Sequence, residues 1–343
     1  MSRAEETRLA RRVTMREIAE RVGVSTNTVS KALSNKPDVS QATREVIQRA
    51  AAELGYDYSA TARAGGSYDS GIVGLVTSDN ANPFFAQAVK GVEWTLQSAG
   101  FTLLLCNTNE EYVREKNVIN MLVERGVDGM ILTPTQIRHD DIRSLQDAKV
   151  PLVLLGRHFL NVGVPSVISD DSGGAFYAVD HLLRLGHRRV LFLNAPEYIS
   201  SAAERLQGYR EAFRSQGIDV DDSVVRTCRP TKEAAYNEMK SILLEGIEFT
   251  AVFAFSDLMM LGVIQLFQER DIRVPDDVSL VGFDDIDFVS LLSPSLTTVT
   301  QDRFGLGARS AECLLRLMRG ESPEEPEIVL PTHLTVRGST ARA

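Results

Sequence analysis

The 343-residue sequence has few of the residues that crosslink proteins or bind metals, with three cysteines and five histidines. Cys106, Cys228 and Cys313 are odd in number and far apart in sequence, which argues against a disulfide framework or a metal site. No apolar run approaches the length of a membrane span, and the charged N-terminus lacks the apolar stretch of a signal peptide. We therefore expect a cytoplasmic protein without a bound metal.

The motifs of common enzymes and cofactor-binding proteins are also missing. There is no Walker-type phosphate loop, and the histidines are scattered along the chain. The GLGA sequence at Gly305 falls inside a predicted helix and not after a strand, so it is not a dinucleotide fingerprint. Gly173 and Gly174 could hold an anion at a helix start, but the adjacent Asp170 and Asp171 oppose this. The sequence predicts neither an enzyme nor a cofactor.

Acidic side chains outnumber basic ones, and the formal net charge is -9. Residues 1–66 reverse this balance, with 11 Lys and Arg against 8 Asp and Glu. An acidic body disfavours indiscriminate attraction to DNA, and a modestly basic N-terminal part needs specific contacts and a second copy to bind tightly. The length also predicts more than one domain.

Residues 13–33, VTMREIAERVGVSTNTVSKAL, have the pattern of a helix-turn-helix. Gly23 can take the left-handed conformation that closes a tight turn, and Ser25 can cap a second helix beginning at about Thr26. Two apolar stripes at helical spacing predict the helices, formed by Met15, Ile18 and Ala19 and by Val24, Val29 and Leu33. The exposed face of the second helix carries side chains able to read bases in a groove: Thr26, Asn27, Ser30 and Lys31.

Two short amphipathic helices joined at a glycine also occur in proteins that do not bind DNA, so this motif alone leaves both interpretations open. The next segment favours a separate small domain. Residues 37–56 predict a third helix, capped at Ser40, that turns its apolar side chains Val46, Ile47, Ala50 and Leu54 toward the first two helices. Three such helices can enclose a core of their own.

Residues 13–56 resemble the DNA-binding headpiece of the LacI/GalR family of bacterial transcriptional regulators. The resemblance continues in order through NPFF, LGHRR, ERLQGY, VPDDVSLVGFDD and LTTVTQD. A headpiece alone is moderately specific, whereas this ordered series is highly specific. The resemblance implies an all-α helix-turn-helix headpiece joined to a two-lobed, periplasmic-binding-protein-like α/β body with parallel sheets.

Pattern and resemblance together give the expected domains. These are a disordered arm, the headpiece, a hinge, and an effector-binding and dimerisation body, at residues 1–12, 13–58, 59–70 and 71–343. The resemblance places lobe one of the body at about 71–165 and 300–325, and lobe two at about 166–299 and 326–343. We assign DNA contacts to Thr14, Ser25, Thr26, Asn27, Thr28, Ser30, Lys31 and Ala62.

The hinge departs from the family pattern. In the family, a hinge helix folds on the operator and inserts a leucine wedge into the minor groove. Ala62 matches the small hinge residue, but the wedge position falls on Gly65, followed by Gly66. Because glycine disfavours helix and cannot unstack a base step, we expect weaker bending of the operator than in relatives that carry leucine.

From Gly71 onward, short apolar runs alternate with helical stretches, which predicts parallel sheets covered on both faces. The runs start at Ile72, Phe101, Gly129, Val150, Arg188, Ala251 and Val278, and the helical stretches are 86–99, 113–125, 173–185 and 258–270. Open α/β sheets bind ligands at the carboxyl edge of the strands. Polar residues at that edge are therefore candidates for one cleft: Ser78, Asn107, Thr133, Arg157, Asn194, Asp257 and Asp284.

Two motifs add ligand-binding candidates to these strand ends. Phe84 and Phe85 in NPFF can stack on a sugar or a planar base, although each could equally belong to the core. Arg205 in ERLQGY matches a family residue that points its guanidinium at the effector. The alternative is a surface ion pair with Glu204 or Glu211.

The choice of carboxylate rests on the resemblance. Asp284 can accept hydrogen bonds from two hydroxyls, but Asp285 and Asp287 follow it closely. Ser256 stands where the family usually has Asn. The predicted effector-binding residues are Phe84, Phe85, Thr133, Arg157, Arg205, Ser256, Asp284 and Gln301. This polar mixture suits a sugar or a similar polyol without identifying one.

The sequence thus predicts a DNA-binding transcriptional regulator, a repressor released from a pseudo-palindromic operator by a small sugar-like effector. No apolar heptad tail follows LTVRGST, so we expect a homodimer formed through the body. An activator or a corepressor-dependent regulator would share every motif. A transport-type sugar-binding protein is a further alternative, against which the helix-turn-helix and the missing signal peptide count.

Overall fold

A computed structural model of the chain describes residues 15–33, 39–54, 70–138, 140–159, 162–323 and 325–343. The chain divides into two units, an N-terminal headpiece and a larger body, and each is described by itself. Thr14, Ala62 and Gly65 lie outside the described residues, so the assignments made there stay predictions.

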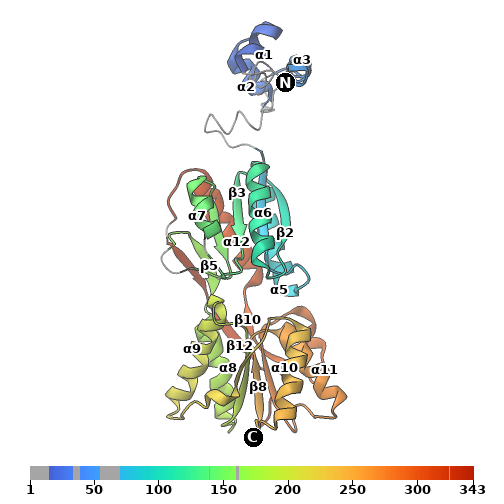
Figure 1. The fold of residues 1–343 in the computed structure, drawn as a ribbon, viewed down its shortest axis with the longest axis vertical. Helices are drawn as coiled ribbons and strands as arrows, with labels where there is room; N and C mark the ends of the chain where they lie inside the picture. The colour runs from blue at the N-terminus through green and yellow to red at the C-terminus, as the bar shows by residue number, and fades with distance from the viewer. Residues whose placement is uncertain (1–14, 34–38, 55–69, 139, 160–161, 324) are drawn as a thin grey trace, which may run out of the picture. The chain divides into compact units, whose positions relative to one another are not determined.

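The described part of the headpiece forms three helices, α1 (Met15–Val22), α2 (Thr26–Leu33) and α3 (Gln41–Leu54) (Figure 1). Gly23 has a φ of 73°, the left-handed conformation that the turn requires. The Ser25 hydroxyl accepts a hydrogen bond of 3.1 Å from the Thr28 N–H, and the Ser40 hydroxyl accepts one of 3.2 Å from the Thr43 N–H. The predicted turn and both predicted caps are confirmed.

All three headpiece helices contribute to one core, in which Ile18, Val29 and Ile47 are fully buried. The prediction that Val46 faces this core is wrong, because its side chain is 48% exposed while Ala51 is buried. Positions 47, 50, 51 and 54 are three and four residues apart and share one helix face, which position 46 does not join.

The body contains two six-stranded sheets (Figure 1). The first has the strand order β11 (Glu327–Leu330), β5 (Ser166–Ser169), β4 (Leu152–Leu155), β3 (Gly129–Leu132), β1 (Ile72–Thr77) and β2 (Thr102–Asn107). The second has the order β12 (Thr332–Thr335), β10 (Thr297–Gln301), β9 (Ser279–Asp284), β8 (Ala251–Ala254), β6 (Val190–Asn194) and β7 (Val225–Thr227). The pairing of β10 with β12 is antiparallel, whereas β10 pairs in parallel with β9.

Helices surround each sheet. Lobe one is the first sheet with α5 (Pro83–Ser98), α6 (Tyr112–Glu124), α7 (Asp140–Asp147) and α12 (Arg303–Met318). Lobe two is the second sheet with α8 (Asp171–Arg184), α9 (Ser200–Ser215), α10 (Lys232–Glu245), α11 (Asp257–Glu269) and the short 3-10 helices Asp222–Val224 and Asp287–Leu291. None of the described helices is long and apolar enough to cross a membrane.

Alternation along the strands explains how lobe two forms two cores. Leu191 and Leu193 of β6 pack in the core with α10 and α11, whereas Val190 and Phe192 pack in the core with α8 and α9. Successive side chains of a strand point to opposite faces, so a continuous apolar run is what a sheet covered on both faces requires. In lobe one, Gly91 of α5 and Gly307 of α12 let the two helix backbones touch, since a Cβ at either position would lie within 2.1 Å of a carbonyl oxygen.

Strand pairing corrects the predicted lobe boundaries. β5 pairs in parallel with β4, and β11 pairs in parallel with β5, so residues 166–169 and 327–330 belong to lobe one and not to lobe two. Residues 300 and 301 end β10 and belong to lobe two. The physical reason is burial, because Val167 and Leu330 pack against the apolar core of lobe one.

Candidate functional site

The second headpiece helix presents polar side chains outward. Thr26 and Asn27 at its start are exposed, and Lys31 is half-buried. Ser25 is exposed and also accepts the capping bond from Thr28, whose hydroxyl lies 2.8 Å from the Ser25 hydroxyl. The side chain of Ser30 lies outside what the structure describes. In helix-turn-helix proteins, the N-terminal residues of the second helix are the ones that contact base edges, and the exposed polar groups of α2 occupy that position.

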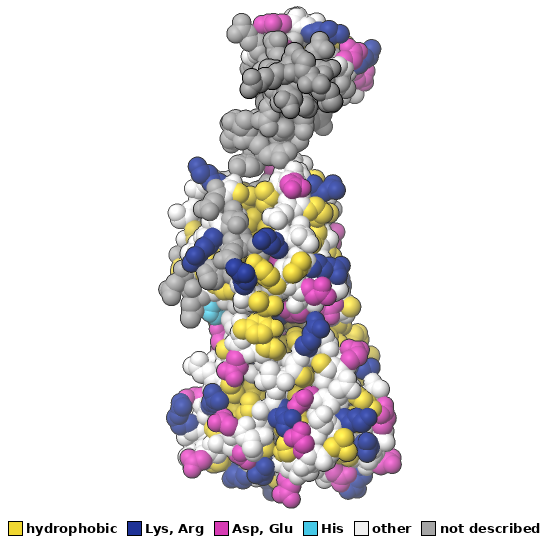
Figure 2. All heavy atoms as spheres, in the orientation of Figure 1, with side chains coloured by type: hydrophobic (Ala, Val, Ile, Leu, Met, Phe, Trp, Pro, Cys, Tyr) yellow, Lys and Arg dark blue, Asp and Glu magenta, His cyan; other side chains and the backbone are white. Residues whose placement is uncertain are grey.

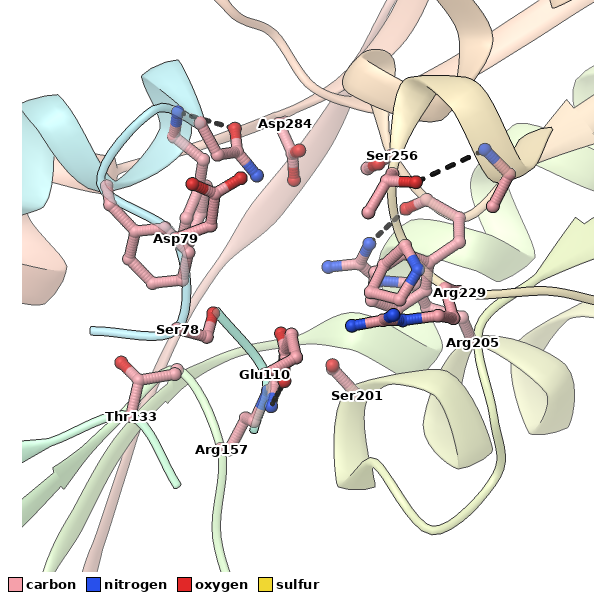
Figure 3. Close-up of a pocket in the computed structure, with 18 of the residues that line it drawn as sticks. Ser78, Asp79, Glu110, Thr133, Arg157, Ser201, Arg205, Arg229, Ser256 and Asp284 are labelled. Atoms are coloured by element: carbon pink, nitrogen blue, oxygen red, sulfur yellow. Dashed lines mark hydrogen bonds and ion pairs between the residues drawn. The ribbon is translucent and has the colours of Figure 1, made fainter. Parts of the chain in front are cut away.

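The body contains a pocket of about 480 Å³ at the strand ends of both sheets. All eight predicted effector residues line it. Figure 3 shows Ser78, Thr133 and Arg157 on one side of the pocket and Ser256, Arg205 and Arg229 on the other. The carboxyl edges of the two sheets therefore supply one shared site, as the rule for open α/β sheets predicts.

In the lobe-one wall, Thr133 and Arg157 follow β3 and β4 and are both buried. The Thr133 hydroxyl donates to the Leu155 carbonyl at 3.0 Å. The Arg157 guanidinium donates to both carboxylate oxygens of Glu110, at 2.9 and 2.5 Å, and to the Pro134 carbonyl at 2.8 Å. Arg157 is thus one half of a buried ion pair.

In the lobe-two wall, Arg205 projects from the second turn of α9 and is only 5% exposed. Its Nε donates to an Asp171 carboxylate oxygen at 2.7 Å, and a terminal nitrogen donates to the Phe255 carbonyl. The guanidinium carbon lies 3.6 Å from the centroid of the Phe283 ring. The surface ion pair with Glu204 or Glu211 is therefore not what the structure contains.

Asp284 ends β9 in a conformation unusual for a residue with a side chain, with a φ of 117°. It is 4% exposed and accepts a bond of 2.8 Å from the Gln301 side-chain amide. Burial raises the pKa of the Asp284 carboxyl well above its ordinary value, although the nearby Arg205 charge opposes the rise. Asp285, the neighbouring acid, instead pairs with Arg337 at 2.7 Å.

The remaining predicted residues combine structural and pocket-lining positions. The Ser256 hydroxyl caps α11 by accepting a bond of 3.2 Å from the Met259 N–H. Phe84 and Phe85 meet edge to face with their ring centroids 5.0 Å apart. Phe85 is buried in the lobe-one core, while Phe84 is half-buried, so Phe84 offers more of its ring to a ligand.

Three of the seven strand-end candidates do not line the pocket. They are Asn107, Asn194 and Asp257. The Asn194 amide is used internally, because it donates to the Ala202 carbonyl at 3.1 Å and accepts from the Ala195 N–H at 2.9 Å. The carboxylate of Asp257 accepts from the Thr298 hydroxyl and from the Ile286 N–H. These side chains satisfy backbone and core groups, so they stabilise the fold around the pocket.

Several pocket residues had no sequence signal. Glu110 and Asp171 neutralise the two buried arginines, and Ser201 lies beside them on α9. The Ser169 hydroxyl at the end of β5 is buried and has no hydrogen-bond partner among the described residues. Such a group loses free energy unless a ligand or water pairs with it. Only its place at a strand end could have indicated Ser169, and β5 itself was not predicted.

Headpiece and pocket together define a class of protein. The headpiece exposes polar side chains of its helix-turn-helix, and the body contains a pocket lined by hydrogen-bonding groups. No cluster of three or more metal-binding side chains occurs in the part of the chain that the structure describes. The class is a DNA-binding protein with a small-molecule binding body.

Known proteins identify the family. The family described as bacterial regulatory proteins, lacI family, matches residues 14–58, and the periplasmic binding protein-like domain matches residues 179–340. The transcriptional repressor CytR of Escherichia coli (strain K12) is 33% identical over 327 residues, which cover 95% of this chain and 96% of CytR.

Two solved structures agree with that assignment. The transcriptional regulator CelR in complex with cellobiose is 34% identical, with a TM-score of 0.72, over 96% of this chain and 100% of that one. The lac repressor dimer bound to operator and the anti-inducer ONPF is 28% identical, with a TM-score of 0.73, over the same shares. The chain belongs to the LacI family, and it is a DNA-binding transcriptional regulator and not an enzyme.

Proposed function

We propose that this regulator is a repressor that binds a pseudo-palindromic operator as a homodimer and is released by a small sugar-like effector. The observation that carries the proposal is the pocket, in which the strand ends of both lobes bring hydrogen-bonding groups together beside the Phe84 ring. Polar groups suit hydroxyls and an aromatic face suits the C–H surface of a sugar ring. The cellobiose bound to CelR supports this class of ligand.

The proposed effector contacts are the eight predicted residues. Asp284 and Gln301 together offer a carboxyl group and an amide, and Arg205 offers guanidinium N–H groups held in a fixed plane. The Thr133 hydroxyl donates within the protein, so it can accept from the ligand through its lone pairs. The Ser256 hydroxyl accepts from a backbone N–H, so it keeps its O–H to donate to the ligand. Arg157 contributes as a pair with Glu110.

The release step works through α9. At its start, the Ser200 N–H donates to the Gln136 side chain at 2.8 Å, and the Ser200 hydroxyl accepts from the His158 N–H at 3.1 Å. Gln136 and His158 belong to lobe one, while Ser201 and Arg205, farther along the helix, line the pocket. A ligand that contacts Arg205 therefore acts on the helix that joins the lobes.

On the DNA side, a changed arrangement of the lobes in each subunit would separate the two headpieces of the dimer. Headpieces at the wrong spacing cannot both enter successive major grooves. The proposed groove contacts are Ser25, Thr26, Asn27, Thr28, Ser30 and Lys31, with Thr14 and Ala62 outside the described part. Because operator DNA is the partner, we place the protein in the cytoplasm.

The ligand class is tested by following the thermal unfolding of the full chain in the presence of sugars and nucleobases. A ligand that binds the folded state raises the melting temperature. We expect at least one saccharide to do so and Phe84→Ala to reduce the shift. If no saccharide raises the melting temperature, the proposed ligand class is wrong. If nucleobases alone raise it, the effector is a planar base and not a sugar.

A further inference from the structure

In the lobe-one wall of the pocket, the Arg157 guanidinium is hydrogen-bonded through both of its terminal nitrogens. Arg157 and Glu110 form a two-bond ion pair, with side chains 7% and 17% exposed. Figure 3 shows the two residues side by side, between Ser78 and Ser201. Arg157 also donates to the Pro134 carbonyl, so both of its terminal nitrogens are bound before any ligand arrives.

The loop conformation places the Glu110 carboxylate beside the Arg157 guanidinium. Asn109 and Glu110 both have left-handed backbones, with φ of 55° and 57°. The Glu110 N–H donates to the Ser78 carbonyl at 3.2 Å, which ties the loop to the end of β1. Burial is the largest single effect on the pKa of the Glu110 carboxyl and raises it, but the charge and hydrogen bonds of Arg157, together with Ser78 and the Arg229 charge, hold it below its ordinary value. Glu110 is therefore ionised at neutral pH.

The second buried arginine also faces a carboxyl group, although burial raises the pKa of that group, Asp171, above its ordinary value against the opposing Arg205 charge. Arg205 pairs with Asp171, and both side chains are almost fully buried. Arg229, the third arginine of the lining, is exposed. Carboxyl groups outnumber guanidinium groups in the lining, with Asp79, Glu110, Asp171, Glu233 and Asp284 against Arg157, Arg205 and Arg229. Among the described lining residues, each buried guanidinium thus faces a carboxyl group, and Arg229 is the arginine that an anion could reach without competing with one of these pairs.

We propose that Glu110 is a specificity-determining residue, which neutralises Arg157 and thereby restricts the pocket to uncharged ligands. Phosphorylated and carboxylated sugars are excluded, because the ionised Glu110 would repel their anionic groups unless these displaced it from its two bonds to the guanidinium. A neutral hydroxyl pays no such cost, since it can accept an N–H that Arg157 has left or donate to a Glu110 oxygen. The inference deepens the proposed function, since it treats the pocket as the effector site.

The test measures anion binding to the full chain by calorimetry at fixed ionic strength, with glucose 6-phosphate and inorganic phosphate as probes. The wild type should bind neither probe at millimolar concentration. Glu110→Gln keeps the size of the side chain, removes its charge and leaves the guanidinium free for an anion. We expect this variant to bind glucose 6-phosphate at least about tenfold more tightly than the wild type, as charge-assisted hydrogen bonds form.

Two matched variants identify the cation responsible. Glu110→Asp keeps the charge and should keep the exclusion. The double variant Glu110→Gln, Arg157→Gln should lose the gained affinity, because the freed guanidinium is gone. If the double variant keeps the gain, the anion binds elsewhere, with Arg229 as the first candidate, and the proposal is overturned.

The wild type alone also decides the question if Glu110→Gln does not fold. Tighter binding of a sugar phosphate than of the matching neutral sugar by the wild type would contradict the charge filter. Failure of the proposed function would look different. In that case no saccharide would affect operator binding, while the gain of phosphate affinity in Glu110→Gln would still appear.

Discussion

Asp284 combines burial, a left-handed backbone and a single amide partner, which is the arrangement of a residue held ready for another molecule. A backbone strain of this kind persists only where the surrounding structure enforces it. The Asp257 carboxylate helps to hold the residues around this turn, since it accepts the Ile286 N–H at 2.9 Å and the Thr298 hydroxyl at 2.7 Å. Asp257 therefore positions the loop that carries the proposed ligand-binding carboxyl group.

The first prediction concerns Asp284→Asn. This change replaces one carboxyl oxygen by a donor and leaves a ligand hydroxyl badly paired, which typically costs about 1 to 3 kcal/mol. Calorimetry with the saccharide that stabilises the wild type should then show binding weaker by roughly five- to 150-fold. Operator affinity without ligand should not change, because Asp284 is not in the headpiece.

Asp287→Asn is the matched control, since this acid is exposed and pairs with Arg303 outside the pocket. It should leave ligand affinity unchanged. Loss of operator binding by folded Asp284→Asn would show that the residue does not serve the effector site. Arg205→Ala is a poorer test, because it leaves Asp171 buried without its partner and can destabilise the whole lobe.

Glu204 gives a prediction about pH. Burial, together with the nearby carboxylates Asp171 and Glu327, raises the pKa of Glu204 from 4.5 to about 8. The folded protein thus keeps a proton that the unfolded chain releases near its ordinary pKa. Stability should fall as pH rises from about 4.5 to about 8 and then level off.

Glu204→Gln removes this titration, so it should raise the melting temperature at pH 8 to 9 and have little effect near pH 4. The measurement is thermal unfolding at several pH values, beside Glu211→Gln, a surface control whose partner is Arg214. Identical pH profiles for the wild type and Glu204→Gln would refute the raised pKa.

At the scale of elements, α2 is the part of the headpiece that should read DNA. Asn27→Ala removes an exposed side chain that can pair with adenine. We expect it to change preference at particular base pairs, by about 1 to 3 kcal/mol, when binding to a selected operator and to random DNA is compared by fluorescence anisotropy.

Gln41→Ala, at the exposed start of α3, provides the control and should leave that preference unaltered. Equal losses on operator and random DNA in Asn27→Ala would remove this residue from the base-reading set.

The helices and strands of the body could largely be predicted from the sequence. All seven predicted strands and the four predicted helical stretches of the body are present, because continuous apolar runs and helical periods are local properties. Among the strands that were missed, β10 and β12 are rich in threonine and β7 has only three residues, so they lack a clear apolar pattern.

Site residues divide in the same way. The pocket-lining positions could be predicted from strand ends and motifs, which depend on sequence order. The partners Glu110 and Asp171 could not, because they lie 47 and 34 residues from the arginines that they neutralise. Whether Arg157 is a free cation or half of an ion pair depends on that distant contact, and so does the charge of an acceptable ligand.

Across the whole molecule, the N-terminal part and the body differ in charge. Figure 2 shows basic and acidic side chains interspersed over the visible face of the body, without a large field of one sign there. The net charge is -9, although residues 1–66 are slightly basic. Electrostatic attraction to DNA is thus confined to the N-terminal part and is weak, so tight binding should require two headpieces on one operator.

Control of operator binding by a saccharide can be measured in one titration. An operator is selected from random DNA with the full chain, and its affinity is measured by anisotropy with and without the stabilising saccharide. We expect a dimer on a pseudo-palindromic site. The wild type should bind this site at least about tenfold more weakly with saccharide than without it, whereas Asp284→Asn should bind it with the same affinity in both conditions. Tighter binding with saccharide would make the ligand a corepressor, and a protein without preference for any sequence over random DNA would not be an operator-binding repressor.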